Sequence, residues 1–430
     1  MLSPPNQSAL SHSQPVVFAV ATMDTKAEEL AWVAGCLRKA NVPVITVDVS
    51  TAKVTGLAAD VTSGEVLAAA GQSWNAVQAM DRGAAVNQMS NAFRVWLLQQ
   101  YENCKVAGVI GLGGSGGTAI VTSGMRALPI GLPKLMVSTM ASGNTAPYVD
   151  CSDICLMPSV VDIAGLNTVS RRVLSNAAHA MAGMVTNAVA DTKVKERPTI
   201  GMTMFGVTTT CVLAVRTALE VAGFDCLVFH ATGAGGRAME KLVESGLIEG
   251  VLDITTTEVA DEVVGGILTA GPQRFDIILQ RQIPYVMSLG ALDMVNFGAK
   301  ETVPERFQNR QLHVHNANVT LMRTTVEENC QIANWIADKL NRITSAVTLL
   351  IPEKGVSAID ADGQPFYDPA ADATLFDELE SRVKQTDSRR IKRLPLHIND
   401  AEFANALVIE FQRLWSARRI QPPPSTRSPS

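Results

Sequence analysis

Short apolar runs alternate with amphipathic stretches along the chain from residue 16 onwards. Residues 16–21 (VVFAVA) form an uninterrupted apolar run, which is typical of a buried strand, and residues 26–40 carry Leu30, Val33 and Leu37 at helical spacing. Strands that alternate with helices of these lengths predict βαβ units and a mostly parallel sheet. The same pattern predicts strands at 43–49, 106–110 and 134–138, and helices at 65–70, 84–102, 118–127 and 165–189.

A polar stretch, residues 191–198 (DTKVKERP), separates this series from a second one. We therefore expect an α/β protein of two Rossmann-like domains, residues 16–195 and 196–418, each a mostly parallel sheet flanked by helices. Residues 1–15 and the Pro/Ser-rich end, 419–430, are expected to be disordered tails. Strands of the second series are predicted at 199–205, 226–230, 250–254, 277–279, 285–289 and 347–351.

The two series resemble each other at their starts. When Ala21 is placed on Thr203, the first strand, the first helix and the second strand of each series coincide without a gap, although few residues are identical. An internal duplication explains this similarity, and so does the common spacing of βαβ units. The low identity favours the common spacing.

The most distinctive motif is the glycine-rich segment 111–118 (GLGGSGGT), which lies between a predicted strand and a predicted helix. Glycines let a ligand approach the backbone closely. The first N–H groups of a helix lack internal partners and carry partial positive charge, and a phosphate satisfies both deficits. A tight turn required only by packing is the alternative. We interpret the segment as an anion-binding loop formed by Gly113, Gly114, Ser115, Gly116, Gly117 and Thr118.

The segment matches neither of the common phosphate-binding fingerprints completely. A P-loop requires Lys and then Ser or Thr after its second glycine, whereas Gly116 is followed by another glycine and a threonine. The spacing does fit G-x-G-x-x-G, but the next predicted strand ends in Ser138 and Thr139 without the acidic residue that binds ribose hydroxyls. The missing acid weakens the interpretation as a dinucleotide site.

Other loops also follow predicted strands, where open parallel sheets bind their ligands. Asp24 follows the first strand and can cap the next helix or contact a ligand, and Lys26 can supply the positive charge that the glycine-rich segment lacks. Asp48 ends the second strand and can meet a ribose or a metal, or serve as a turn residue. The segment 138–145 (STMASGNT) suits phosphate or ribose contacts through its hydroxyls, or is an ordinary polar loop.

The second predicted domain offers further candidates. Residues 232–237 (TGAGGR) also join a strand to a helix and can hold a second anion, or close on the first one through Arg237. His313 and His315 share one face of a predicted strand, but no third ligand has a telling spacing, so no metal site is predicted. The candidates for acid–base or recognition roles, with capping and turn roles as the alternative, are His230, Glu258, Asp293, Asn296 and His315.

Composition and charge narrow the class of protein. A content of 47% hydrophobic and 18% charged residues supports sizeable cores, and the net charge of −5 argues against a general nucleic-acid binder. The seven cysteines are scattered, which favours free thiols in a reducing compartment. The start has no secretory signal and no apolar run is long enough to cross a membrane. We therefore expect a cytoplasmic protein without a membrane partner.

Several motifs in order resemble the tomato mosaic virus resistance protein family. They include ATMDTKAEEL, GLGGSGGT, STMASGNT, DIAGLN, LDITTTEVADEVVGG and HNANVTLMRTT, and the match runs from Val17 to Asp368. The resemblance implies two Rossmann-like domains, ATP bound in the N-terminal one, and homodimers. The plant member of the family inhibits a viral replication protein, a role that we do not transfer. The resemblance further implies that the nucleotide lies near the glycine-rich segment and near Asp24, Thr25, Lys26, Ser142 and Gly143.

Three functions follow from these observations. The first is an ATP-binding enzyme in which ATP, with Mg²⁺ as a candidate co-ligand, acts on a small metabolite in the cleft between the domains. The second is a non-catalytic module in which the nucleotide gates binding of a protein partner. The third is a dinucleotide-dependent oxidoreductase, which the G-x-G-x-x-G spacing suggests. The spacing of residues reveals no Ser/His/Asp arrangement, so no catalytic residue is assigned.

Overall fold

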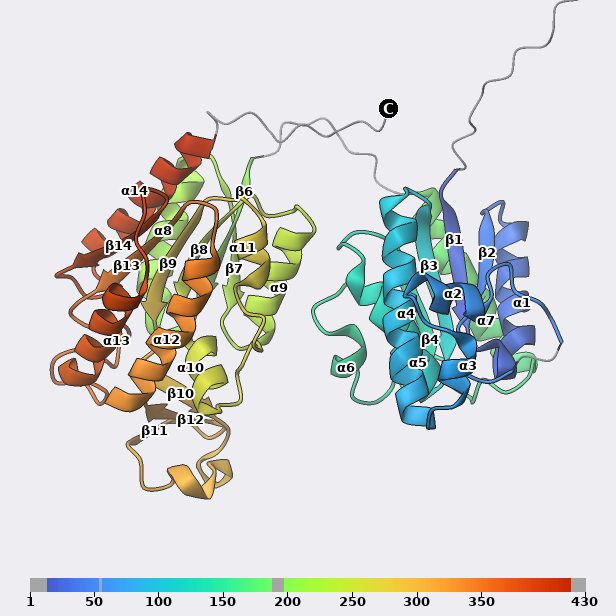
Figure 1. Ribbon diagram of the computed structural model, residues 1–430, viewed down its shortest axis with the longest axis horizontal. Coiled ribbons are helices and arrows are strands. Elements are labelled where there is room, and N and C mark those ends of the chain that lie inside the picture. The colour runs from blue at the N-terminus through green and yellow to red at the C-terminus, as the bar shows by residue number, and fades with distance from the viewer. Residues whose placement is uncertain (1–13, 54–55, 188–196, 419–430) are drawn as a thin grey trace, which may run out of the picture. The chain divides into compact units, whose positions relative to one another are not determined.

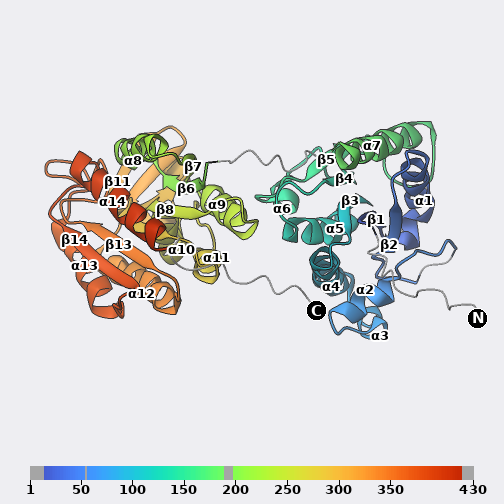
Figure 2. The same ribbon diagram turned by 90° about the horizontal axis from the view of Figure 1, so that it is seen from above.

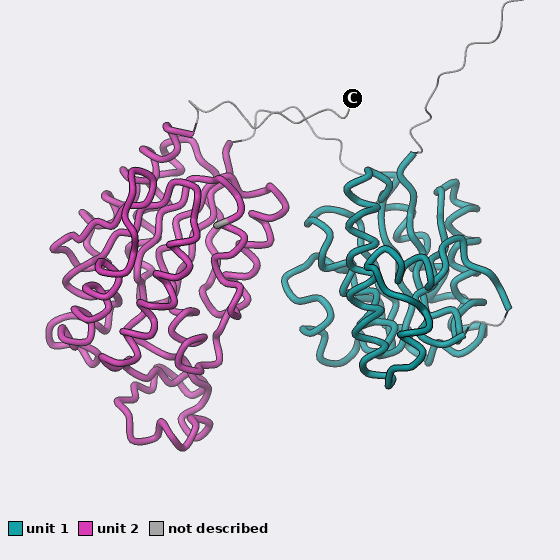
Figure 3. The backbone as a smooth tube through the Cα atoms, viewed as in Figure 1, with its two compact units in different colours: residues 1–192 teal, residues 193–430 magenta. Residues whose placement is uncertain are grey.

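The computed structural model describes residues 14–53, 56–187 and 197–418. The chain divides into two compact units, residues 1–192 and 193–430 (Figure 3). Each unit is an α/β domain built on a parallel sheet, which confirms the fold class predicted from the alternating patterns. The boundary expected at 195–196 and nearly all of the expected tails, 1–15 and 419–430, lie outside the described residues.

Unit 1 contains a five-stranded sheet in the order β2-β1-β3-β4-β5, in which every neighbouring pair is parallel (Figure 1). The ends of β1 and β4 are those predicted from the apolar runs. In chain order the elements are β1 (Val16–Ala21), α1 (Met23–Lys39), β2 (Val44–Asp48), α2 (Ser63–Ala69), α3 (Trp74–Gln78), α4 (Arg82–Glu102), β3 (Val106–Gly113), α5 (Ser115–Ala127), β4 (Lys134–Ser138), α6 (Ala146–Val149), β5 (Cys155–Pro158) and α7 (Thr168–Thr186).

Helices cover both faces of the first sheet, with α1 and α7 on one side and α4 and α5 on the other (Figure 2). Alternate residues of β1 contribute to different cores. Phe18 and Val20 pack in the core with Phe93 of α4, whereas Val17 and Ala19 belong to the core under α1 and α7. Burial on both faces explains why the strands are continuous apolar runs rather than alternating ones.

The strand order places the carboxyl ends of β1 and β3 at the centre of one edge of the sheet. From β1 the chain moves to one side to form β2, and later strands are added on the other side, beginning with β3. Ala21 at the end of β1 pairs with Leu112 of β3. Doubly wound sheets bind their ligands at such a reversal of strand order. The segments after β1 and after β3 therefore lie where a ligand is expected.

Unit 2 contains a six-stranded sheet in the order β14-β13-β9-β8-β6-β7, again with parallel neighbours, and a three-stranded antiparallel sheet in the order β10-β12-β11. In the described ranges of both units, none of the helices has the length and apolar character that crossing a bilayer requires. The elements are β6 (Thr199–Met204), η1 (Gly206–Thr208), α8 (Thr209–Val221), β7 (Asp225–His230), α9 (Ala234–Glu244), β8 (Gly250–Thr255), α10 (Thr257–Val264), α11 (Asp276–Gln280), β9 (Tyr285–Gly290), β10 (Met294–Phe297), η2 (Lys300–Thr302), η3 (Glu305–Phe307), β11 (Leu312–Asn316), β12 (Val319–Arg323), α12 (Val326–Arg342), β13 (Val347–Pro352), α13 (Pro369–Arg382), β14 (Arg389–Leu394) and α14 (Ala401–Arg418).

The two parallel sheets share one topology. When the strands are numbered along the chain within each parallel sheet, the order 2-1-3-4-5 occurs in both, and the sheet of unit 2 has a sixth strand at its edge. The similarity between the two series therefore extends from spacing to strand order. Because this order is common among doubly wound folds, it is compatible both with duplication and with common spacing.

Two local predictions differ from the structure. The strand predicted at 277–279 is wrong, because these residues lie in the short helix α11; a three-residue apolar run does not distinguish a strand from one buried helical turn. The loop predicted at 111–118 is much shorter than expected. Strand β3 continues to Gly113, which pairs with Ser138, and α5 begins at Ser115, so Gly114 alone links the two elements.

Candidate functional site

The turn between β3 and α5 presents helical N–H groups that have no protein acceptor. The N–H of Thr118 donates to the carbonyl oxygen of Gly114 at 2.8 Å, which is the first hydrogen bond of α5. Within the described residues, the N–H groups of Ser115, Gly116 and Gly117 make no hydrogen bond to the protein. Such groups carry the partial positive charge of a helix N-terminus and suit an anion.

Packing accounts for only some of the glycines in this turn. A Cβ atom at Gly113 would lie 2.8 Å from backbone atoms in the first turn of α5, so the close approach of helix to strand requires glycine there. At Gly114 and at Gly116, the nearest neighbour of a Cβ atom would lie 3.8 Å away, which is an ordinary contact distance. Neither residue has a positive φ. The described fold therefore gives no reason for glycine at positions 114 and 116.

Thr118 holds the turn against the neighbouring strand. Its side chain is fully buried, and its Oγ1 lies 2.6 Å from the Oγ of Ser138 at the end of β4. Ser138 Oγ in turn accepts a hydrogen bond from the N–H of Met140 at 2.9 Å. The Thr118 side chain therefore joins α5 to β4 by a hydrogen bond, and its role in nucleotide binding stays a prediction.

The start of α1 is already capped by residues at the end of β2 and just after it. The N–H of Met23 donates to Asp48 Oδ1 at 3.1 Å, and the N–H of Asp24 donates to Ser50 Oγ at 3.0 Å. Asp48 Oδ1 also accepts from the N–H of Ser50 at 2.9 Å. Asp48 thus caps α1 through Oδ1. Of the two roles considered for Asp24, the structure rules out capping, because the carboxylate that caps this helix comes from another strand.

The first turn of α1 lies beside the glycine-rich turn. A Cβ atom at Gly117 would lie 3.7 Å from Thr22 Oγ1, immediately before this helix. Asp24 and Thr25 are exposed, and Lys26 has φ −135° and ψ 27°, which interrupts the helical geometry. Partial desolvation, with a contribution from the nearby Asp48 carboxylate, raises the pKa of Asp24. The structure therefore brings the predicted residues of this turn to the same edge of the sheet as the glycines.

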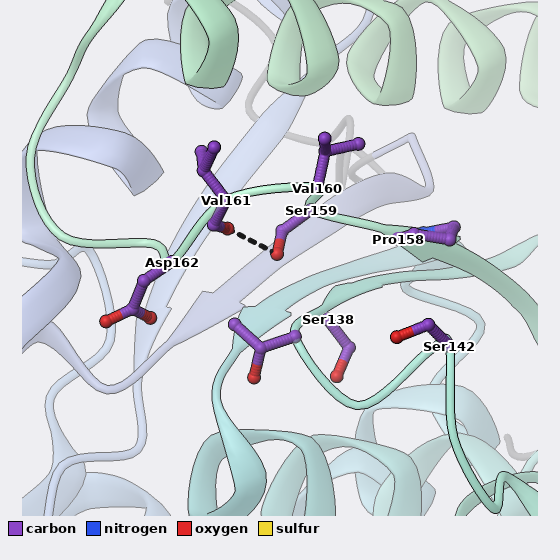
Figure 4. Close-up of a pocket in the computed structure, with 8 residues that line it drawn as sticks. Ser138, Ser142, Pro158, Ser159, Val160, Val161 and Asp162 are labelled. Atoms are coloured by element: carbon purple, nitrogen blue, oxygen red, sulfur yellow. Dashed lines mark hydrogen bonds between the residues drawn. The ribbon is translucent and has the colours of Figure 1, made fainter.

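A pocket of about 400 Å³ opens beside the glycine-rich turn, between the loops that follow β4 and β5 (Figure 4). The N–H of Thr139 donates to the carbonyl oxygen of Gly113 at 3.3 Å and so joins the pocket wall to the turn. Ser142, one of the predicted residues, lines the pocket, and Gly143 follows it in the same loop. The lining residues are Ser138, Thr139, Ser142, Pro158, Ser159, Val160, Val161 and Asp162.

The wall formed by residues 158–162 was missed by the sequence reasoning. Ser159 Oγ donates to the carbonyl oxygen of Val161 at 2.6 Å (Figure 4), and Val160 has φ 67°, which is rare for a β-branched residue. Asp162 lies at the far end of this segment and is exposed. The available signal was the segment PSVVD, which carries a serine and an acid and directly follows the short apolar run CLM.

The second glycine-rich loop is filled by the protein itself. The Oε1 atom of Glu258 accepts hydrogen bonds from the N–H groups of Gly233 at 2.7 Å and Gly236 at 3.0 Å, and its Oε2 pairs with Arg274 Nε at 2.9 Å. Glu258 is only 1% exposed. A buried carboxylate of the protein thus occupies the N-terminus of α9, which disfavours the alternative in which this loop holds a second anion. Arg237 donates to the carbonyl oxygen of Thr269 at 3.2 Å.

The remaining candidates of unit 2 differ in burial and in hydrogen-bond partners. Burial raises the pKa of Asp293 to about 7, and its Oδ2 accepts from Ser357 Oγ at 2.8 Å. Asn296 is buried and donates to Thr257 Oγ1 and to Asp261 Oδ2, both at 3.1 Å. In contrast, the side chains of His230 and His315 are exposed on β7 and β11. Over the described ranges, no three His, Cys, Asp or Glu residues gather in a way that could hold a metal ion.

Comparison with known proteins assigns the chain to a family. Models of the N-terminal and C-terminal domains of the uncharacterised protein family UPF0261 match residues 15–190 and 197–415. The chain belongs to the UPF0261 family. A UPF0261 protein of Rhizobium meliloti (strain 1021) is 54% identical over 398 residues, which cover 92% of this chain and 98% of the relative. A UPF0261 protein of Clostridium tetani is 48% identical over 392 residues, which cover 91% of this chain and 96% of the relative.

A plant relative extends well beyond the matched region. The ToMV resistance protein Tm-1(GCR237) of Solanum lycopersicum is 50% identical over 419 residues, which cover 93% of this UPF0261 chain but only 56% of the tomato protein. The chain therefore spans just over half the length of this relative. The family resemblance indicated by the sequence motifs is confirmed.

Proposed function

We propose that unit 1 binds ATP, with the phosphates at the N-terminus of α5. The observation that carries this proposal is the pair of glycines at 114 and 116, which packing does not require, beside three N–H groups without protein acceptors in the described chain. The turn also lies at the reversal of strand order, where doubly wound sheets bind ligands. The family resemblance supports ATP among the possible phosphate ligands.

The first turn of α1 supplies charged side chains to the same site. Lys26 provides the positive charge that a P-loop takes from its own lysine. Asp24 is exposed, whereas Asp48 is buried and caps α1 through Oδ1, so we assign Asp24 as the carboxylate that would contact Mg²⁺ accompanying ATP. In this arrangement ATP is held by backbone N–H groups on one side and by charged side chains on the other.

Calorimetric titration of ATP, with and without Mg²⁺, tests the proposal. The side chain of Gly116→Val would occupy the surface where the phosphates bind, and we expect it to weaken ATP binding at least about 100-fold through the loss of two charge-assisted hydrogen bonds. Its melting temperature should stay close to that of the wild type, because position 116 has room for a Cβ atom. Equal affinity in the variant, or no binding of ATP to the wild type, would contradict the proposal.

A glycine elsewhere in unit 1 provides the matched control. Gly35 lies within α1, and a Cβ atom there would meet no neighbouring atom within 4 Å. We expect Gly35→Val to retain the wild-type affinity for ATP. Titration with NAD⁺ and NADP⁺ tests the oxidoreductase alternative, which gains support only if a dinucleotide binds and ATP does not.

A measurement of ATP turnover distinguishes the ATP-dependent enzyme from the non-catalytic, nucleotide-gated module. An ATP-dependent enzyme would release ADP or AMP when supplied with its metabolite, whereas a nucleotide-gated module would bind a protein partner differently with and without ATP. The homodimer and the cytoplasmic location rest on the resemblance and the composition, respectively. Sedimentation and cell fractionation test them.

A further inference from the structure

The pocket beside the glycine-rich turn extends from the proposed phosphate site to the side of β4 and β5. Thr139 links the pocket to the glycine-rich turn. Its N–H donates to the carbonyl oxygen of Gly113, and its Oγ1 would lie 3.8 Å from a Cβ atom at Gly114. On the side of β1 and β2, Asp48 and Ser50 already occupy the start of α1. A ligand whose phosphates lie at α5 therefore finds space for its remaining part towards β4 and β5.

The polar groups of the pocket divide into two sets. Ser138 and Ser159 are buried and use their hydroxyls within the protein. Thr139, Ser142 and Asp162 also line the pocket, and within the described residues their side chains make no hydrogen bond to the protein. Two hydroxyls and one carboxylate are thus left for a ligand.

The carboxylate decides which part of a ligand fits. Asp162, when ionised, accepts hydrogen bonds and donates none, so it repels a phosphate and suits a group that carries adjacent hydroxyl donors. The threonine and serine hydroxyls both donate and accept, which suits the oxygens of the same group. A sugar with two neighbouring hydroxyls satisfies this set.

The backbone of the upper wall keeps apolar side chains out of this space. Val160 is held at φ 67°, a conformation that a β-branched residue rarely adopts. Its side chain is 77% exposed, and the Val160 and Val161 side chains point away from Ser138 and Ser142 (Figure 4). The strained turn therefore leaves a polar wall that ends in Asp162.

We propose that this pocket binds the ribose of the nucleotide, with the Asp162 carboxylate accepting hydrogen bonds from the 2′- and 3′-hydroxyls. This inference rests on the proposed nucleotide site. Asp162 follows β5, whereas the dinucleotide fingerprint expects an acidic residue after β4, where this chain has none. Its proposed role is the same as that of the ribose-binding acid in dinucleotide folds. The protein should consequently select ribonucleotides over 2′-deoxyribonucleotides.

Titration with ATP, 2′-deoxy-ATP and inorganic tripolyphosphate tests the inference on the full chain. We expect the wild type to prefer ATP over 2′-deoxy-ATP by about tenfold or more, which is the effect of one hydrogen bond to a charged group. Asp162→Ala should reduce this preference to less than about twofold and leave the affinity for tripolyphosphate at least as high as before. Gly116→Val should weaken the binding of all three ligands.

A second acidic residue controls for the loss of one surface charge. Glu102 is exposed at the end of α4, just before β3 begins, and so lies at the opposite edge of the sheet. Glu102→Ala should keep the preference for ATP over 2′-deoxy-ATP.

The outcomes separate the ribose inference from the proposed function. Equal binding of ATP and 2′-deoxy-ATP by the wild type overturns the ribose inference, and so does an Asp162→Ala variant that loses as much affinity for tripolyphosphate as for ATP. The proposed function survives both results as long as ATP binding depends on Gly116. Failure of the wild type to bind ATP overturns both.

Discussion

The two glycine-rich turns have similar sequences but opposite surroundings. Both GLGGSGGT and TGAGGR join a parallel strand to a helix, and the sequence suggests an anion at each. In the second turn, the Glu258 carboxylate accepts the helical N–H groups, and a Cβ atom at Gly235 or Gly236 would overlap His230 or Glu258. In the first turn, no described residue accepts hydrogen bonds from the first N–H groups of the helix, and a Cβ atom would fit at two of the glycines, Gly114 and Gly116. A helix N-terminus needs an acceptor, and the rest of the fold decides whether that acceptor is internal.

The internal acceptor of the second turn belongs to a buried ionic network. Arg274 pairs with Glu258, Asp253 and Glu240 at 2.8–2.9 Å, and all four side chains are largely shielded from water. Leaving a buried charge without its partner costs folding free energy. The N–H groups of an exposed turn can instead be hydrated until a ligand binds. The first turn is therefore suited to reversible binding and the second to structure.

The largest expected effect comes from neutralising the internal acceptor. Glu258→Gln keeps the shape of the side chain but leaves Arg274 and the N–H groups of α9 incompletely paired. We expect the free energy of unfolding of unit 2 to fall by about 3–5 kcal/mol, as measured by urea denaturation. Glu244→Gln removes an exposed partner of Lys241 and should cost at most about 1 kcal/mol. A loss below about 1 kcal/mol for Glu258→Gln would mean that the network does not stabilise the second turn.

A smaller effect should distinguish the glycines within the first turn. Gly113→Ala forces a methyl group against the backbone of α5, and we expect unit 1 to lose about 1–3 kcal/mol of stability in thermal or chemical denaturation. Gly114→Ala has room for the added atom and should change stability by at most about 0.5 kcal/mol, while weakening ATP binding. If both variants lost equal stability, packing would explain both glycines and the turn would resemble the second one.

Sequence patterns predicted the fold well because its strands are buried on both faces. The ends of β1 and β4 follow directly from apolar runs, and the alternation of elements indicates the parallel sheets. The failure at α11 has a local cause, since Ile277 and its neighbours are too few to show a period.

Long-range contacts limited the prediction of the site. Glu258 follows the second turn in the chain by more than twenty residues, so no local pattern shows that its carboxylate enters that turn. Asp48 caps α1 from the neighbouring strand for the same reason. Asp162 was not a candidate because it follows β5, whereas the dinucleotide fingerprint places the ribose-binding acid after the strand that follows the glycines. Ser142 was a candidate because its loop directly follows that strand and lies in a motif that resembles the family.

Amide-resolved NMR during an ATP titration tests the central claim most directly. The account predicts that the amide signals of Ser115, Gly116 and Gly117 shift as ATP saturates the protein, while those of Gly233 and Gly236 stay unchanged because Glu258 holds them. Unchanged signals at α5, or shifts at the second turn instead, would contradict it.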